Sequence, residues 1–140
     1  MGRIIGLDLG EKRIGVAVSD ETATISTAAD TIIRLSAKDL IKKISGMAAS
    51  YCADEVVIGL PLNMNGTRGP QADKAISFVE KLKKGISCKV STFDERLTTA
   101  QGEAILISAD MSRKKRKQNI DKLAAQIMLQ AYLDYKNVSK

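Results

Sequence analysis

Hydrophobic positions in the first third of the chain change from a strand pattern to a helical one. Residues 3–9 and 14–18 are apolar runs of strand length, and the turn residues 10–13 between them predict a β-hairpin. A weaker strand signal covers residues 22–33. From Ala37 onward, apolar residues recur at the spacing of an amphipathic helix, with Ser36 and Asp39 placed as a capping pair at its start.

The middle of the chain alternates between strand and helix patterns. Strands are predicted over residues 55–60 and 88–93. A helix begins near Pro70 and ends in a basic turn followed by glycine. The Pro-, Gly- and Asn-rich segment before Pro70 is longer than a minimal connector, as is typical of loops that carry function.

The carboxyl-terminal part of the chain reads as helical. We expect a helical segment over residues 99–108, then the basic run 113–117, then a last helix with Asp121 at its start. An antiparallel amino-terminal unit followed by βα units predicts an α/β fold with parallel strands and helices on the faces of the sheet. No repeat or linker divides the chain, so we expect one domain over residues 1–140.

The amino-acid composition excludes several classes of hydrolytic active site. The 140 residues include no histidine, which eliminates Ser-His-Asp triads, Cys-His pairs and histidine-based zinc sites. The two cysteines, Cys52 and Cys88, are too few for a thiolate zinc site, and we expect buried thiols in a reducing compartment. No apolar run has the length of a signal peptide or membrane span, so we expect a soluble, cytoplasmic protein with no membrane partner.

Four carboxylates lie where strands end or a helix is expected to begin. Asp8 closes the first strand, Asp94 and Glu95 follow the last one, and Asp121 opens the final helix. Each has an ordinary structural explanation, as a turn residue, a solvated charge or a helix-dipole partner. If the strand ends converge, the acids repel one another unless a cation neutralises them. Oxygen ligands without histidine or thiolate favour Mg²⁺ or Mn²⁺.

Basic residues dominate the charge balance and flank these acids. The chain carries 22 Lys and Arg against 16 Asp and Glu, a net charge of +6. This excess is compatible with solubility alone and also with a polyanionic partner. No aromatic side chain interleaves the basic residues, so contact with a phosphate backbone is favoured over base stacking. The candidate substrate-binding residues are Lys12, Arg13, Arg68, Arg96, Arg113, Lys114, Lys115, Arg116 and Lys117.

Four ordered motifs extend over nearly the whole chain and resemble one family. The segments are GLDLGEKRIGVAVSD, VIGLPLNMNGTRGPQA, FDERLTT and RKKRKQNIDKLAAQIMLQAYL. Together they resemble the YqgF family, also called RuvX. The resemblance implies a ribonuclease H-like fold with a five-stranded mixed sheet flanked by helices. It also implies a nuclease that matures the 5′ end of pre-16S ribosomal RNA, a family long described as Holliday junction resolvases.

The resemblance also implies site residues. The first family acid falls on Asp8, the acid of the DER motif on Glu95 with Asp94 as its neighbour, and the helix-start acid on Asp121. We therefore expect Asp8, Glu95 and Asp121 to be catalytic and to bind Mg²⁺ or Mn²⁺. Glu95 is favoured over Asp94 for its reach, although strand pleat decides between them. The motif NMNG departs from the expected NMDG, because Asn65 replaces an acid.

The sequence leaves several functions open. The leading hypothesis is a metal-dependent endonuclease that processes pre-16S ribosomal RNA, either as structured RNA or within the small-subunit precursor. Alternatives are a resolvase of branched DNA, which requires a homodimer, and an RNA-binding ribosome-assembly factor without turnover. An ATPase of the actin and hexokinase type is disfavoured, since it needs two such domains and the chain has no Walker-A or GxGxxG segment. Monomer and homodimer both remain open.

Overall fold

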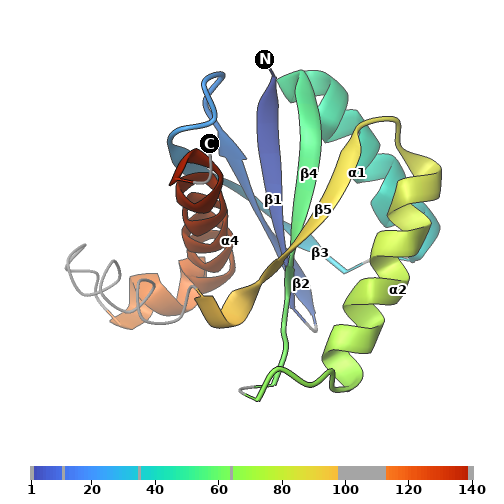
Figure 1. Cartoon of the computed structure of the whole chain (residues 1–140), viewed down its shortest axis with the longest axis vertical. Helices are drawn as coiled ribbons and strands as arrows, with labels where there is room; N and C mark the ends of the chain where they lie inside the picture. Colours follow the sequence, from blue (N-terminus) through green and yellow to red (C-terminus); the bar gives the residue numbers. More distant parts are fainter. Residues whose placement is uncertain (1, 11, 35, 64, 98–112, 139–140) are drawn as a thin grey trace.

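The computed structural model describes the backbone of residues 2–10, 12–34, 36–63, 65–97 and 113–138, and within these the side chains outside 113–122 and 138. It contains strands, helices and one 3₁₀ turn (Figure 1). In chain order these are β1 (Arg3–Leu9), β2 (Arg13–Ser19), β3 (Ser26–Ile33), α1 (Ala37–Tyr51), β4 (Ala53–Leu60), α2 (Pro70–Gly85), β5 (Lys89–Asp94), η1 (Glu95–Leu97) and α4 (Arg113–Val138).

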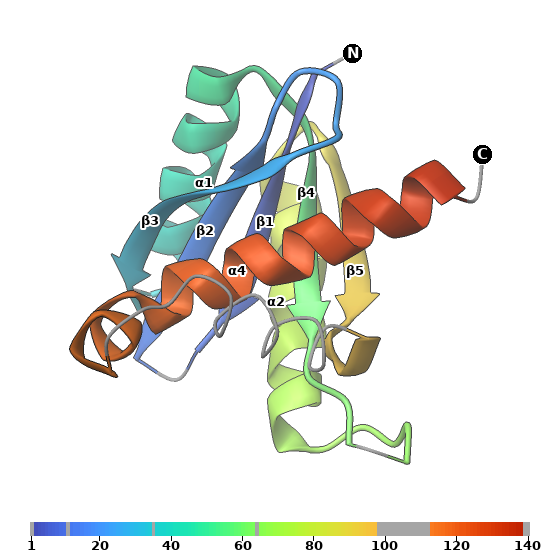
Figure 2. The same cartoon turned by 90° about the vertical axis from the view of Figure 1, so that its left-hand side faces the viewer.

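The five strands form one mixed sheet in the order β3-β2-β1-β4-β5. β1 pairs antiparallel with β2 and β2 with β3, whereas β1 pairs parallel with β4 and β4 with β5. Helices α1 and α2 cover one face, and α4 crosses the other face (Figures 1 and 2). The predicted hairpin, parallel βα units and five-stranded mixed sheet are confirmed, and the carboxyl ends of β1, β4 and β5 lie at one edge.

The period-two alternation of β1 divides the core into two layers. Ile5 and Leu7 are fully buried against α1 and α2, whereas Ile4 belongs to the cluster under α4. Gly6 also faces α4, since a Cβ atom there would lie 2.9 Å from the Cβ of Leu129. The missing side chain thus lets α4 approach the sheet closely, and the next residue on this face is Asp8.

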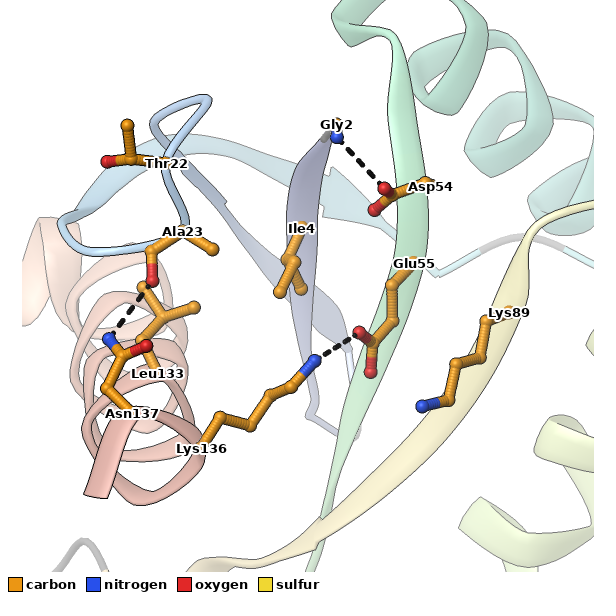
Figure 3. A pocket seen from close by; sticks show the side chains of 10 residues that line it. All are labelled: Gly2, Ile4, Thr22, Ala23, Asp54, Glu55, Lys89, Leu133, Lys136 and Asn137. Atoms are coloured by element: carbon orange, nitrogen blue, oxygen red, sulfur yellow. Dashed lines mark hydrogen bonds and ion pairs between the residues drawn. The ribbon is translucent and has the colours of Figure 1, made fainter. Parts of the chain in front are cut away.

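A buried carboxylate joins the carboxyl-terminal half of α4 to the sheet. Glu55 in β4 is 4% exposed and accepts hydrogen bonds from the hydroxyls of Ser91 (2.8 Å) and Tyr132 and from Nζ of Lys136 (3.1 Å). Figure 3 shows the Lys136 contact beside a cavity of about 320 Å³. Burial alone would raise the pKa of Glu55, but the three donors together hold it below its usual value.

The helix predictions are confirmed in place, with one error at a helix start. Helix α1 begins after Ser36, whose hydroxyl accepts from the amide of Asp39 at 3.3 Å, and Pro70 opens α2. The last helix was expected to begin at Asp121, but α4 begins at Arg113, eight residues earlier. Lys, Arg and Gln have high helix propensity, and no Gly or Pro interrupts the basic run. The helix predicted over 99–108 lies outside the described residues.

The two cysteines are not the buried thiols that were expected. Both are free, Cys52 is exposed and Cys88 is half-buried. Cys52 ends α1 in the left-handed conformation, with φ 55° and ψ 43°, and its amide donates to the carbonyls of Ala48 and Ala49. A helix end of this kind favours glycine, because a Cβ atom is strained there. The structural constraint at Cys52 is therefore the left-handed backbone at the end of α1, and not burial of the thiol.

Replacing Cys52 by glycine is expected to stabilise the protein by about 1 kcal/mol, because it relieves the left-handed strain at the end of α1. Thermal unfolding of Cys52→Gly against the parent measures this. Cys52→Ser is the matched control, since it removes the thiol and keeps the Cβ atom. Equal melting temperatures for Cys52→Gly and Cys52→Ser would contradict the prediction.

Removing the charge of Glu55 is expected to destabilise the fold by about 3 kcal/mol near neutral pH, because Lys136 loses its buried partner. The folded-state pKa of Glu55 is depressed, so its stabilisation is present above the unfolded-state pKa and is lost as the pH falls through the folded-state pKa. Urea unfolding of the parent and of Glu55→Gln should therefore differ near pH 7 and converge in acid. A difference that does not depend on pH would refute this account.

Candidate active site

Asp8 lies at the carboxyl end of β1, on the face that α4 covers. The alternation that turns Ile4 and Gly6 toward α4 places Asp8 on the same side. Asp8 is opposite Gly15 in the β1–β2 ladder and is half-buried. The hairpin closes directly after it, where the amide of Gly10 donates to the carbonyl of Arg13 at 2.9 Å. Asp8 therefore sits on a rigid strand end and not in a loop.

Glu95 reaches the same edge from β5. The parallel register pairs Gly59 with Phe93 and Leu60 with Asp94, and the chain then turns into η1 at Glu95. The carboxyl group of Glu95 lies over Gly59, where a Cβ atom would be 2.9 Å from both Cγ and Cδ of Glu95. Gly59 thus leaves the space that the Glu95 side chain occupies. A glycine inside a strand pattern often marks such a close approach, so Gly59 was visible in the sequence but was not singled out.

Asp8 and Glu95 form a hydrogen-bonded carboxyl pair. Burial raises the pKa of Glu95 to about 9, and the hydrogen bond with Asp8 and the charges of Asp8 and Asp94 add to this. Two carboxylates in one half-buried site do not both ionise at neutral pH without a neutralising cation. The pair therefore holds a proton when no cation is bound, and its oxygens offer hard ligands to one.

Asp94, the neighbour of Glu95, forms an ion pair with Arg96. It accepts from the backbone amide of Arg96 at 3.0 Å, from Nε at 2.9 Å and from Nη2 at 2.6 Å. These hydrogen bonds to the Arg96 side chain hold the pKa of Asp94 below its usual value. Of the two adjacent acids, it is Glu95 that contacts Asp8, as its longer reach suggested. Arg96 is 32% exposed, so part of its guanidinium faces solvent.

The β4–α2 loop packs beside Arg96 and is held by its own hydrogen bonds. Gly66 has φ +87°, and a Cβ atom there would lie 3.4 Å from Nη1 of Arg96. Asn65 Oδ1 accepts from the amide of Thr67 at 3.0 Å and from its hydroxyl at 2.6 Å. Asn63 closes the turn by accepting from the Gly66 amide at 2.8 Å. Asn65, which replaces the expected acid, is thus engaged in shaping the loop.

Other predicted substrate-binding residues are distributed around this edge. Lys12 and Arg13 are exposed at the β1–β2 hairpin. Arg68 forms an exposed ion pair with Asp73 of α2 at 3.1 Å. The basic run occupies the first turns of α4, and its side chains, like that of Asp121, lie outside the described residues. The residues of the run are Arg113, Lys114, Lys115, Arg116 and Lys117.

The direction of α4 brings its amino-terminal part toward the carboxyl edge of the sheet. Lys136 contacts Glu55 near the start of β4, and Leu129 packs over Gly6 in the middle of β1. The amino-terminal part of α4 continues in the same direction, and Figure 2 shows the helix crossing the sheet obliquely. Within the side chains that the structure describes, no three His, Cys, Asp or Glu residues gather into a metal-binding group. Asp8 and Glu95 therefore stand as a pair there.

Asp20 follows β2 directly and is engaged in a turn. Its carboxylate accepts from the amides of Ile25 (3.0 Å) and Thr24 (2.8 Å) and from the hydroxyl of Thr22 (2.6 Å). These bonds, the one from Ile25 foremost, lower the pKa of Asp20 to about 2. These hydrogen bonds fix Asp20 within the turn between β2 and β3. In the described part of the chain, no helix is long and apolar enough to cross a membrane.

The fold is similar to that of solved Holliday junction resolvases. T. thermophilus RuvC in complex with Holliday junction substrate superposes with a TM-score of 0.66 at 8% identity, covering 100% of this chain and 98% of that one. The fowlpox virus Holliday junction resolvase superposes with a TM-score of 0.55 at 16% identity, covering 95% and 99%. The five-stranded mixed sheet with its flanking helices is thus the ribonuclease H-like fold that was expected.

Sequence comparison gives closer relatives. A protein of Caldanaerobacter subterraneus is 52% identical over 133 residues, covering 94% of this chain and 96% of the relative. A protein of Halothermothrix orenii is 45% identical over 135 residues, covering 96% of both. Each is named "Putative pre-16S rRNA nuclease". The family described as "RuvX: Holliday junction resolvase" matches residues 2–135, and the chain belongs to the RuvX family.

Proposed function

We propose that this chain is a divalent-metal-dependent endonuclease that processes the 5′ end of pre-16S ribosomal RNA, with Asp8 and Glu95 at its active site. The carboxyl pair at the edge of the sheet is the observation that carries the proposal, because two acids are held together there at an electrostatic cost. The names of relatives at 45% and 52% identity supply the substrate.

A divalent cation fits the chemistry of this pair. The ligands would be carboxylate oxygens from Asp8 and Glu95, and in this proposal Asp121 supplies a third from α4. Hard oxygen donors without nitrogen or sulfur favour Mg²⁺ or Mn²⁺. When bound, such an ion supplies Lewis-acid activation of water and of the phosphodiester. Binding requires loss of the proton that the pair otherwise holds, which couples occupancy to ionisation of Glu95.

The surrounding residues hold the site and the substrate in place. Gly59 leaves room for the carboxyl group of Glu95, and Arg96 binds the neighbouring carboxylate of Asp94. The exposed part of Arg96 and the side chains of Lys12 and Arg13 are suited to hold phosphates near the acids. Arg68 and the basic run at the start of α4 extend this surface in the proposal. Both cysteines are free, in keeping with action in the reducing cytoplasm.

Cleavage of branched DNA is the second candidate, because the family itself is described as Holliday junction resolvases. Symmetric cutting of a four-way junction requires two active sites, so this function predicts a homodimer. An RNA-binding assembly factor without turnover is the third reading. Purified protein supplied with pre-16S RNA and with a four-way DNA junction, each with and without Mg²⁺ or Mn²⁺, distinguishes them. Cleavage of RNA alone supports the proposal, and no cleavage of either overturns it.

Substitution of either acid of the pair is expected to abolish activity. Asp8→Asn and Glu95→Gln should each lower the rate of RNA cleavage by at least about 100-fold, because each removes a charged oxygen ligand of the cation. Glu80→Gln is the control, since Glu80 is an exposed acid on α2 away from the pair. Single-turnover cleavage measures the rates. Parent-like cleavage by Asp8→Asn would end the assignment.

Gly59 is expected to be a positioning residue. Gly59→Ala should lower the cleavage rate about tenfold or more, because the new methyl group displaces the carboxyl of Glu95. Raising the Mn²⁺ concentration should recover part of the rate if weakened cation binding is the cause. Gly46→Ala is the matched control: it lies within α1, and a Cβ atom there meets nothing within 4 Å. Equal cleavage rates for Gly59→Ala and Gly46→Ala would show that the position of Glu95 over Gly59 is not required for activity.

A further inference from the structure

A groove lies between the start of α1 and the side of α2, on the face of the sheet opposite α4. One part, of about 620 Å³, is lined by Leu9, Gly10, Pro61, Arg34 and Lys74, among others. A second part, of about 250 Å³, is also lined by Arg34 and Lys74 and ends at Lys81. The two hollows share Arg34 and Lys74 in their linings and are therefore adjacent, and together we call them the α1–α2 groove.

The charged side chains described in the lining of the α1–α2 groove are all cationic. Its described lining includes three cationic side chains, Arg34, Lys74 and Lys81, and no acid. Lys74 and Lys81 are exposed, and neither forms an ion pair with a described residue. They are seven residues apart, which places them on one face of α2 about 10 Å from each other.

The α1–α2 groove begins at the edge of the sheet that carries the acids. Leu9 and Gly10 follow Asp8 directly in the chain, and Pro61 follows Leu60 at the end of β4. Arg34 is fixed at this rim, since its Nη1 donates to the carbonyl of Gly10 at 2.5 Å. A strand of nucleic acid that passes over the carboxyl edge from Asp8 therefore meets the cations of this groove on the other side.

We propose that the α1–α2 groove binds the sugar-phosphate backbone of nucleic acid on one side of the scissile bond. The inference rests on the proposed function and extends it to a surface outside the predicted basic residues. A row of lysines with exposed ammonium groups suits phosphates. The aromatic residue of the lining, Phe78, is 7% exposed and belongs to the core, so the groove offers no aromatic anchor of the kind that protein interfaces use.

The test is a binding measurement on the full-length protein without divalent metal. A fluorescent pre-16S RNA that carries its 5′ leader is titrated with the parent and with Lys74→Gln/Lys81→Gln, in EDTA, over a range of salt concentrations. The groove variant should bind about tenfold more weakly, and the magnitude of the slope of log affinity against log salt should fall by about 1.4 to 1.8, because two phosphate contacts are lost. Affinity and slope equal to those of the parent would overturn the proposal.

The matched control is Lys42→Gln/Lys43→Gln, which removes the same charge from exposed positions of α1 outside the groove. An equal loss in this control and in the groove variant would also overturn the proposal, because the effect would then be one of net charge. A cleavage assay with Mn²⁺ separates the two proposals. If the parent cleaves RNA but the groove variant shows no specific loss of binding, only the groove proposal is refuted. If the groove variant shows a specific loss of binding but the parent does not cleave RNA, only the proposed nuclease function is refuted.

Discussion

The central constraint of this structure is the confinement of two carboxyl groups at one edge of a sheet. Asp8 and Glu95 are 87 positions apart in the sequence, and the parallel pairing of β1 with β4 and of β4 with β5 brings them together. Burial, with the hydrogen bond and charge of Asp8 added to it, raises the pKa of Glu95 to about 9, which expresses the cost of keeping a charge there. Stability alone does not require such a pair, since an apolar residue at either position would avoid the cost. A cation bound between the two carboxylates would offset this cost.

The packing around the pair protects its geometry. Gly6 lets α4 lie close to β1, Gly59 leaves space for the Glu95 side chain, and Arg96 binds the neighbouring Asp94. At the opposite end of α4, Glu55 binds Tyr132 and Lys136 from within the sheet. A helix held at one end and packed closely in its middle has a defined direction. That direction points the amino-terminal part of α4 to the edge where the acids lie.

The distribution of basic residues indicates how a polyanion meets this edge. Cations lie on the hairpin at Lys12 and Arg13, beside the acids at Arg96 and in the α1–α2 groove at Lys74 and Lys81. These positions lie on both sides of the carboxyl edge, so they suit a strand that crosses it. The β4–α2 loop lies next to Arg96 and is stiffened by Asn65 and Thr67. A substrate would therefore encounter a largely preformed surface.

Local patterns were sufficient for the hairpin, for α1 and α2 and for the succession of strands along the chain, because alternation, capping and turn chemistry act over a few residues. Motif resemblance was sufficient for the ribonuclease H-like fold and for the choice of Asp8 and Glu95 as candidates.

The sequence did not show that Asp94 pairs with Arg96, because the partner of Asp94 depends on how the chain passes from β5 into η1. It did not show the role of Glu55 either, whose partner Tyr132 lies 77 residues away. The start of α4 was misjudged because a run of like charges resembles a solvated segment, although its residues favour a helix. Contacts between distant segments decide such features, since burial and the choice of hydrogen-bond partner exist only once the chain has folded.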